Sequence, residues 1–230
     1  LRYQVFIKEF GAGTTKKNHE SLLDKDKFDE NCDHLLLIDR QEKVVVGTIR
    51  LINSSVAKAN FGFYSSDEFN LCQILKLYKR CLEIGRACIE KKYRGSIALH
   101  LLWSGLGQYV ISQDIKVMFG VASFHGNNVN KFSSALSYLS YNFGASKELQ
   151  FNANIYSSCN MSIIPPEKLN VKTAMTEMPS LIRAYLRLGA KVGEGAFVDT
   201  VFNTIDVGII IDINSMNKKY KDFYGRPRRI

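Results

Sequence analysis

The sequence predicts an α/β fold in which a mixed central sheet is flanked by helices. Apolar runs of strand length alternate with segments of helical spacing through the middle of the chain, and two strand-like runs follow one another near its end. With 230 residues and a hydrophobic fraction of 46%, the chain has enough apolar surface for one sizeable core. We therefore expect a single domain over residues 1–213 and a basic tail over residues 214–230.

The first part of the chain predicts a helix, a loop and a hairpin. Residues 1–10 have the spacing of an amphipathic helix, and the acid-rich stretch after them is typical of a loop. The apolar runs at 34–38 and 44–53 are separated by a polar turn, as in a hairpin. Gly47, inside the second run, indicates a bulge or a close approach of another segment.

The centre of the chain predicts a charged strand. An aromatic segment at 61–64, in a short strand or loop, and a helical segment at 71–78 lead into an apolar strand at 82–89. This strand carries Glu83 and Arg86 among its apolar residues. Charges inside a buried strand are costly, so this strand is where we look first for chemistry.

A positive turn follows that strand and leads into a helix. Lys92 and Arg94 precede Gly95, and Ser96 is the expected N-cap of an amphipathic helix over 96–113. The free N–H groups and the dipole at a helix N-terminus favour a phosphate group. The turn is therefore a candidate anion site.

The last third of the chain predicts the other half of the sheet. The expected elements are a strand at 116–123, a helix at 130–143, a polar irregular span at 144–178 interrupted by Pro165 and Pro166, a helix at 179–188, and strands at 196–202 and 206–213. We expect residues 144–195 to be an insertion-like segment at one side of the sheet.

The net charge of +9 points to an acidic partner. The chain shows neither zinc-finger spacing nor an aromatic RNA-binding signature, so we expect no nucleic-acid partner and no metal. It also lacks an apolar run long enough to span a membrane. The five cysteines form no C-x-x-C pair and are expected as buried free thiols. The chain begins within an apparent element and without Met, which suggests missing N-terminal residues.

The turn Arg94-Gly95-Ser96-Ile97-Ala98 resembles the R-G-x-G-x-A turn of the GNAT acyltransferases, although the second glycine is replaced. In that family the turn and the following helix hold the phosphate groups of an acyl donor. The resemblance implies a GNAT-like sheet. It also implies that Lys92, Arg94, Gly95 and Ser96 bind an acyl-phosphopantetheine arm.

Longer motifs resemble the ornithine N-acyltransferases of ornithine-lipid synthesis and, more distantly, the acyl-homoserine lactone synthases. They include Val46-Gly47-Thr48-Ile49-Arg50-Leu51, Glu83-Ile84-Gly85-Arg86-Ala87-Cys88, Leu102-Trp103-Ser104-Gly105-Leu106, Ala122-Ser123-Phe124-His125-Gly126 and Phe202-Asn203-Thr204-Ile205-Asp206-Val207. The resemblance implies transfer of a 3-hydroxy fatty acyl group from acyl carrier protein to the α-amine of L-ornithine, giving lyso-ornithine lipid. It implies no permanently bound cofactor, because acyl carrier protein, which is acidic, is a co-substrate. It further implies a cytoplasmic enzyme, with possible peripheral contact with the anionic inner membrane.

Glu83 is the first candidate for the general base that deprotonates the attacking amine. A carboxylate inside an apolar strand has a raised pKa, as such a base requires. The alternative is that Glu83 forms an internal salt bridge with Arg86 or with Arg50. Both roles stay open.

The resemblance to the lactone synthases assigns further site residues. Arg2, Phe6, Asp33, Arg50, Glu83 and Arg86 match charged and aromatic positions that this family shares, where the acids contact the amino-acid substrate and the arginines hold the cluster together. Asp29 and Asp33 are spaced four apart where the family has three, which favours Asp33 over Asp29.

Three more side chains are candidates on their own chemistry. Glu194 and Asp199 offer carboxylates for the side-chain ammonium of ornithine, the alternative being solvated loop carboxylates. His125 lies at the end of the strand over 116–123, where it could relay protons near neutral pH.

Two other functions stay open at this level. One is lactone synthesis or acylation of glycine or lysine; Trp103 is the only tryptophan, so the tryptophan expected in the N-terminal loop of the lactone synthases is missing. The other is a non-catalytic module that binds membrane surfaces through the basic tail.

Overall fold

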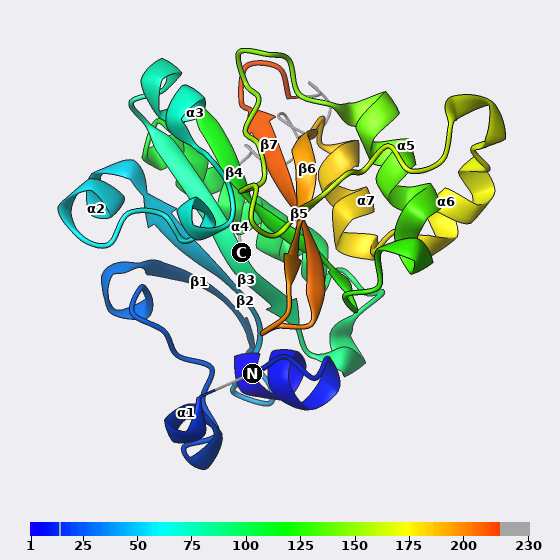
Figure 1. Ribbon diagram of the computed structural model, residues 1–230. Coiled ribbons are helices and arrows are strands. Elements are labelled where there is room, and N and C mark those ends of the chain that lie inside the picture. The colour runs from blue at the N-terminus through cyan, green and yellow to red at the C-terminus, as the bar shows by residue number, and fades with distance from the viewer. Residues whose placement is uncertain (14, 217–230) are drawn as a thin grey trace.

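The protein is built on one seven-stranded mixed sheet. A computed structural model describes residues 1–13 and 15–216 (Figure 1). The strand order is β1-β2-β3-β4-β7-β6-β5, and within this order only the β3–β4 pair is parallel. The strands are β1 (Asp33–Asp39), β2 (Val44–Asn53), β3 (Cys81–Ile89), β4 (Val117–His125), β5 (Ser158–Cys159), β6 (Lys191–Asp199) and β7 (Thr204–Asp212). The predicted α/β sheet with flanking helices is confirmed.

Helices cover the two faces of this sheet. The α-helices are α1 (Lys16–Glu20), α2 (Ser54–Ala59), α3 (Cys72–Leu77), α4 (Ala98–Ser112), α5 (Ser133–Phe143), α6 (Val171–Glu177) and α7 (Ser180–Arg187). The shorter turns are η1 (Tyr3–Glu9), η2 (Asp29–Asn31), η3 (Tyr64–Asp67), η4 (Lys91–Tyr93), η5 (Val129–Phe132) and η6 (Pro166–Lys168). Within the described residues, no helix has the length and apolar character needed to cross a membrane.

The two faces have different cores. Helices α4, α5 and α7 pack against one face, where Leu106, Leu136 and Ile182 join strand residues such as Leu82 and Val207 in the larger cluster. In Figure 1, α5, α6 and α7 gather beside β6 and β7.

The opposite face is covered by α2, η3, α3 and the segment at 151–153. Its core is rich in aromatic rings, with Phe63 packed edge-on against Phe119 and Phe69 against Phe151. We call this side of the sheet the aromatic face; it carries the site described below.

The hairpin of β1 and β2 is confirmed, and so is the special role of Gly47. A Cβ at Gly47 would lie 2.9 Å from Cδ1 of Leu102, which is on α4. The glycine therefore lets α4 pack closely on β2, as the sequence indicated.

Some boundaries differ from the prediction. η1 is a π-helix over Tyr3–Glu9, and α6 interrupts the span at 144–178 that was expected to be irregular. β6 begins at Lys191 rather than at 196, since Gly193 and Gly195 interrupt its apolar pattern at a bulge. Of the predicted tail over 214–230, residues 217–230 lie outside the described residues.

β3 and β4 separate after only three residue pairs. The ladder joins Cys81 to Val117, Leu82 to Met118 and Glu83 to Phe119, and then ends. Just beyond, Gly120 passes so close to β3 that a Cβ there would lie 2.1 Å from the carbonyl oxygen of Ile84.

A bulge on β3 turns this strand away from β4. Between the pairs Thr48–Cys88 and Arg50–Gly85, β3 has one residue more than β2, and Arg86 in this bulge has a φ of 49°. Because β3 and β4 diverge beyond Glu83, their facing edges keep backbone groups available for a ligand between them.

Candidate active site

Glu83 lies at the point where β3 and β4 separate, on the aromatic face. Its carboxylate accepts hydrogen bonds from the backbone N–H groups of Tyr64 (2.8 Å) and Ser65 (2.6 Å) and from the Ser65 hydroxyl. Burial raises the pKa of Glu83, although the bonds from Ser65 and Tyr64 oppose this shift. The predicted raised pKa is thus confirmed, while the base role remains a prediction.

Three arginines and three aspartates form a compact cluster next to Glu83. Its members are Arg2, Asp24, Asp26, Asp29, Arg50 and Arg86, and we call it the Arg–Asp cluster. Arg50, whose side chain is 2% exposed, donates to Asp26 at 2.6 and 2.7 Å and to Asp29 at 3.1 Å. A buried guanidinium needs such partners, so the loop at 24–29 is fixed over β2.

Arg2, from the N-terminal segment, and Arg86, from β3, complete the cluster. Arg2, at the start of η1, donates to Asp24 at 2.7 Å and to both oxygens of Asp29. Arg86 donates to Asp26 at 3.2 Å and lies 3.5 Å from Asp24. Formal charges within the cluster cancel, so it can order the N-terminal segment without leaving an unbalanced buried charge.

The electrostatics of Asp29 show how strong these contacts are. Burial alone would raise the pKa of Asp29, but hydrogen bonds from Arg2 and from the backbone N–H of Asp26 outweigh it and hold the pKa at about 2. Asp29 therefore belongs to the structural cluster, contrary to the preference for Asp33.

Asp33 is the predicted site residue that the structure places elsewhere. It begins β1 in an exposed position, and its carboxylate accepts a hydrogen bond at 2.7 Å from the Tyr109 hydroxyl on α4. Since α4 covers the opposite face of the sheet, Asp33 does not contact the Arg–Asp cluster. Its role toward the amino-acid substrate, which the resemblance implies, stays a prediction. Phe6 lies half-buried on η1.

Arg86 is held between two aromatic rings. Its guanidinium lies 4.9 Å from the ring centres of both Tyr64 and Phe202. Tyr64 is in turn fixed by Glu83, so β3, η3 and the turn before β7 meet at this side chain.

Three further carboxylates converge beside Arg86 and Tyr64. Glu68, Asp199 and Asp206 place oxygen atoms within 4.8 Å of one another, and we call them the acidic triad. Burial raises the pKa of Glu68 and of Asp206, and the proximity of the other acids raises both further. Three close carboxylates form a site for a cation.

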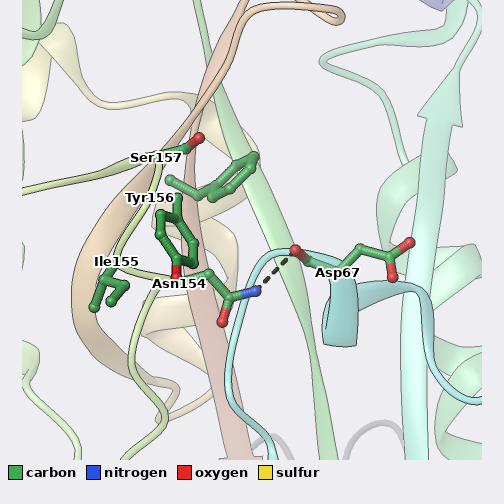
Figure 2. Close-up of a pocket in the computed structure, with 6 residues that line it drawn as sticks. Asp67, Asn154, Ile155, Tyr156 and Ser157 are labelled. Atoms are coloured by element: carbon green, nitrogen blue, oxygen red, sulfur yellow. Dashed lines mark hydrogen bonds between the residues drawn. The ribbon is translucent and has the colours of Figure 1, made fainter.

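A pocket of about 480 Å³ lies among η3, the segment at 154–157 and β6. It is lined by Asp67, Asn154, Ile155, Tyr156, Ser157 and Phe197 (Figure 2). The Asn154 side chain donates to the Asp67 carbonyl at 2.8 Å, and the Asn154 backbone N–H donates to the Glu68 carbonyl at 2.8 Å. Phe197 lies two residues before Asp199 on β6, so both side chains face the same side of the sheet.

The basic turn has the predicted position but different internal contacts. Lys92, Arg94, Gly95 and Ser96 are exposed between β3 and α4, and Gly95 has a φ of 74°. α4 begins at Ala98, so Ser96 lies before the capping position, yet its hydroxyl still accepts from the Ala98 N–H at 3.2 Å.

Arg94 is engaged by the N-terminal segment. It forms a bidentate pair with Glu9 of η1 and donates to the Ile89 carbonyl at 2.8 Å. His125 ends β4 and stacks on Phe10 with ring centres 3.9 Å apart. The partial burial of the imidazole lowers the pKa of His125. These contacts join η1 to the ends of β3 and β4, where these two strands are no longer paired.

Sequence reasoning missed several residues of the site. Asp24 and Asp26 lie in an acid-rich stretch that gives no sign of which acid meets an arginine, since the partners are distant in sequence. Tyr64 comes from the segment at 61–64 that was predicted only as a short aromatic strand or loop, and Glu68 lies in the stretch after it, for which no element was predicted. Asp206 did give a signal, because a carboxylate near the start of the apolar run at 206–213 has to be buried.

The parallel strands that separate, the basic turn and the helix after it define an acyltransferase of the GNAT class. Residues 1–104 match the family model described as "Acetyltransferase (GNAT) domain". The fold is also that of the solved structure "The structure of a COA-dependent acyl-homoserine lactone synthase, BjaI, with MTA". The TM-score is 0.52 at 13% identity, over 97% of this chain and 76% of that chain.

Curated relatives are similar along nearly the whole chain. The L-ornithine N(alpha)-acyltransferase of Rhodobacter capsulatus is 39% identical over 98% of this chain and 88% of its own length. The protein of the same name from Brucella abortus is 39% identical over 98% of this chain and 83% of its own length. The chain therefore belongs to the L-ornithine N(alpha)-acyltransferase family.

Proposed function

We propose that this enzyme transfers a 3-hydroxy fatty acyl group from acyl carrier protein to the α-amine of L-ornithine, giving lyso-ornithine lipid. The observation that carries the proposal is the 39% identity, over 98% of the chain, to relatives named for acylation of the α-nitrogen of ornithine. The net charge of +9 supports an acidic protein as donor.

In the proposed complex, the phosphopantetheine arm enters between the diverging β3 and β4. The positive turn of Lys92 and Arg94 and the N-terminal end of α4 then hold its phosphate. Backbone N–H groups at the β3 bulge are suited to donate hydrogen bonds to the developing oxyanion of the thioester carbonyl. No permanently bound cofactor is needed for these steps.

The chemical step is aminolysis of a thioester. The neutral α-amine attacks the carbonyl carbon, the C–N bond forms, and the tetrahedral intermediate expels the phosphopantetheine thiolate. The amine loses one proton and the leaving thiolate gains one. A single group that accepts the first proton and returns a proton to the thiolate is therefore sufficient. Glu83 is our proposed base, with Arg50 and Arg86 as the cations that position it and the neighbouring loop.

The test is a thiol-release assay with 3-hydroxyacyl carrier protein and a panel of L-ornithine, L-lysine, glycine and S-adenosylmethionine. We expect release to be highest with ornithine and to give an amide product of the corresponding mass. Equal release from free coenzyme A thioester would refute the carrier-protein donor. Release with S-adenosylmethionine and formation of a lactone would refute the ornithine assignment in favour of lactone synthesis.

We also propose that the enzyme works in the cytoplasm and contacts anionic membrane, because its product is an amphiphile. Residues 214–230 include six lysines and arginines, which suit such a surface. Flotation with vesicles of phosphatidylglycerol should retain the full chain and lose a variant truncated after residue 213. Equal flotation of both would refute a role for the tail.

A further inference from the structure

We infer that the acidic triad of Glu68, Asp199 and Asp206 binds the side-chain ammonium of the acceptor, so that the enzyme selects a diamino acid. The inference rests on the proposed function and adds the residues that bind the second amine of the acceptor. Neither Glu68 nor Asp206 was a candidate from the sequence, and Glu194, which was, lies elsewhere.

Two oxygen atoms of the triad are buried without a hydrogen-bond partner. They are Oε2 of Glu68 and Oδ1 of Asp206, on residues that are 5% and 3% exposed. A buried carboxylate oxygen that makes no hydrogen bond is costly, and such atoms in native proteins mark sites completed by a ligand. A ligand that completes the site would supply donors, because an ionised carboxylate oxygen is an acceptor.

Among the described residues, the triad also has no ion-pair partner. In the Arg–Asp cluster, three arginines are already matched by three aspartates. The ion pairs among the described residues do not extend to Glu68, Asp199 or Asp206. The charge of Arg86 lowers the pKa of Asp206, but Arg86 also pairs with Asp24 and Asp26.

The spacing of the triad suits an ammonium group. An alkylammonium has three N–H donors in a tetrahedral arrangement, so three acceptors at about 2.8 Å from its nitrogen lie about 4.6 Å from one another. The carboxylate oxygens of the triad all lie within 4.8 Å of one another. One ammonium can therefore donate to all three carboxylates at once.

The contacts already present leave these oxygens available. Asp206 accepts from the Thr204 hydroxyl at 3.1 Å through Oδ2, which leaves Oδ1 for a ligand. Asp199 uses Oδ1 to accept from the backbone N–H groups of Val201 and Phe202, which leaves Oδ2. Both residues are thereby fixed in orientation before the ligand arrives, which lowers the entropic cost of binding.

Two residues that line the pocket in Figure 2 lie within two positions of a triad residue in the chain. Its volume of about 480 Å³ is ample for a free amino acid, and its wall includes Asp67, which precedes Glu68 in the chain, and Phe197. Asp199 is half-buried, whereas Asp206 is buried.

Glu194 offers a matched control. It lies on β6 like Asp199, but it is exposed and accepts a hydrogen bond from Gln150 at 2.7 Å. A Glu194→Gln variant removes one acid from the same strand without changing the triad.

The experiment compares L-ornithine with L-norvaline, which has the same carbon skeleton without the second amine. The readouts are kcat/KM with 3-hydroxyacyl carrier protein and calorimetric affinity without donor. We expect the wild type to prefer ornithine by at least about 30-fold, because an analogue that leaves buried polar groups unpaired is strongly rejected. Asp206→Asn, Glu68→Gln and the half-buried Asp199→Asn should each reduce that preference at least about tenfold, while Glu194→Gln should keep it.

Each other result has a distinct meaning. Equal use of norvaline and ornithine by the wild type, or a preference that survives all three triad variants, would overturn the inference and leave the acyltransferase intact. Absence of turnover with every amino acid would overturn the proposed function, and the inference would then stand or fall on whether ornithine binds more tightly than norvaline in calorimetry. A preference that requires added Mg²⁺ or Ca²⁺ and disappears with EDTA would overturn it in favour of a metal site.

Discussion

At the scale of single residues, Glu83 shows how a carboxylate can support both structure and chemistry. An ionised carboxylate has about four lone-pair sites, and three hydrogen bonds from Tyr64 and Ser65 occupy three of them. The remaining site can accept a proton from an amine, directly or through one water molecule. The same three bonds fix η3, and through η3 they fix Tyr64 against Arg86.

Glu83→Gln separates these two roles. If Glu83 is the base, kcat should fall by about 10²-fold or more and the acidic limb of the pH–kcat profile should disappear. Because an amide nitrogen would face the N–H donors of η3, some loss of stability is expected as well. A large loss of kcat with an unchanged pH profile would identify Glu83 as a positioning residue only.

Ser65→Ala is the companion variant, since it keeps the carboxylate of Glu83 and removes the hydroxyl that donates to it. The bond from Ser65 lowers the pKa of Glu83, so its loss should raise that pKa. The acidic limb of the profile should then move to higher pH.

At the scale of the elements, the close packing of β4 on β3 just beyond their last paired residues depends on one glycine. Gly120→Ala would place a Cβ 2.1 Å from the carbonyl oxygen of Ile84. Only a shift of the backbone could relieve this clash, and such a shift is costly. We expect a loss of about 2 kcal/mol or more in the free energy of unfolding, measured in urea. Gly85→Ala on β3 is the control, because nothing lies within 4 Å of a Cβ at that position. Similar losses for both variants would show that the close approach is not what matters.

The contact between η1 and the basic turn yields a prediction about the acyl donor. Glu9 and Arg94 have side chains 27% and 33% exposed, and such a pair contributes at most about 1 kcal/mol. A donor phosphate can therefore displace Glu9 from Arg94. Glu9→Gln should lower KM for the acyl carrier protein thioester by up to about fivefold, since 1.4 kcal/mol corresponds to tenfold.

Arg94→Gln is the counterpart of that variant and should raise the same KM, with KM for the amino acid unchanged in both. If neither substitution changes KM for the donor, the basic turn does not bind the phosphopantetheine phosphate.

At the scale of the whole molecule, local patterns predicted the sheet but not the pairing of its distant charges. The hairpin, β3, α4, α5 and the two long C-terminal strands follow from apolar spacing, which is a local property. The sequence could not show that Asp29 pairs with Arg2 and Asp33 with Tyr109, because the partner of each acid is set by the tertiary fold. The start of β6 was missed for a similar reason: its bulge at 193–195 is stabilised by backbone bonds to the segment at 151–153.

The acidic triad couples the stability of the whole molecule to pH. Other titratable or charged groups that influence Glu68 and Asp206 are Asp199, Tyr64, Glu83 and Arg86. Because the folded-state pKa of Glu68 and of Asp206 is raised, the folded protein keeps protons that the unfolded chain releases above about pH 4. These two groups therefore cost stability increasingly as the pH rises from the unfolded pKa through the folded one. Asp29 has the opposite sign: its contribution is present above about pH 4 and is lost as the pH falls from there to about 2.

Glu68→Gln should consequently raise the melting temperature, and by more at pH 8 than at pH 5. A neutral amide pays no ionisation cost, and its NH₂ group can donate to the carboxylates of Asp199 and Asp206. With about 1.4 kcal/mol for each unit of pKa shift and about 2–4 °C for each kcal/mol in a chain of this size, the extra gain at pH 8 should reach at least ~3 °C by calorimetry. Glu194→Gln should change neither value. A gain in melting temperature of the same size at both pH values would mean that Glu68 is ionised in the folded protein. Charged partners within the protein would then stabilise the triad, and an external cation would not be needed.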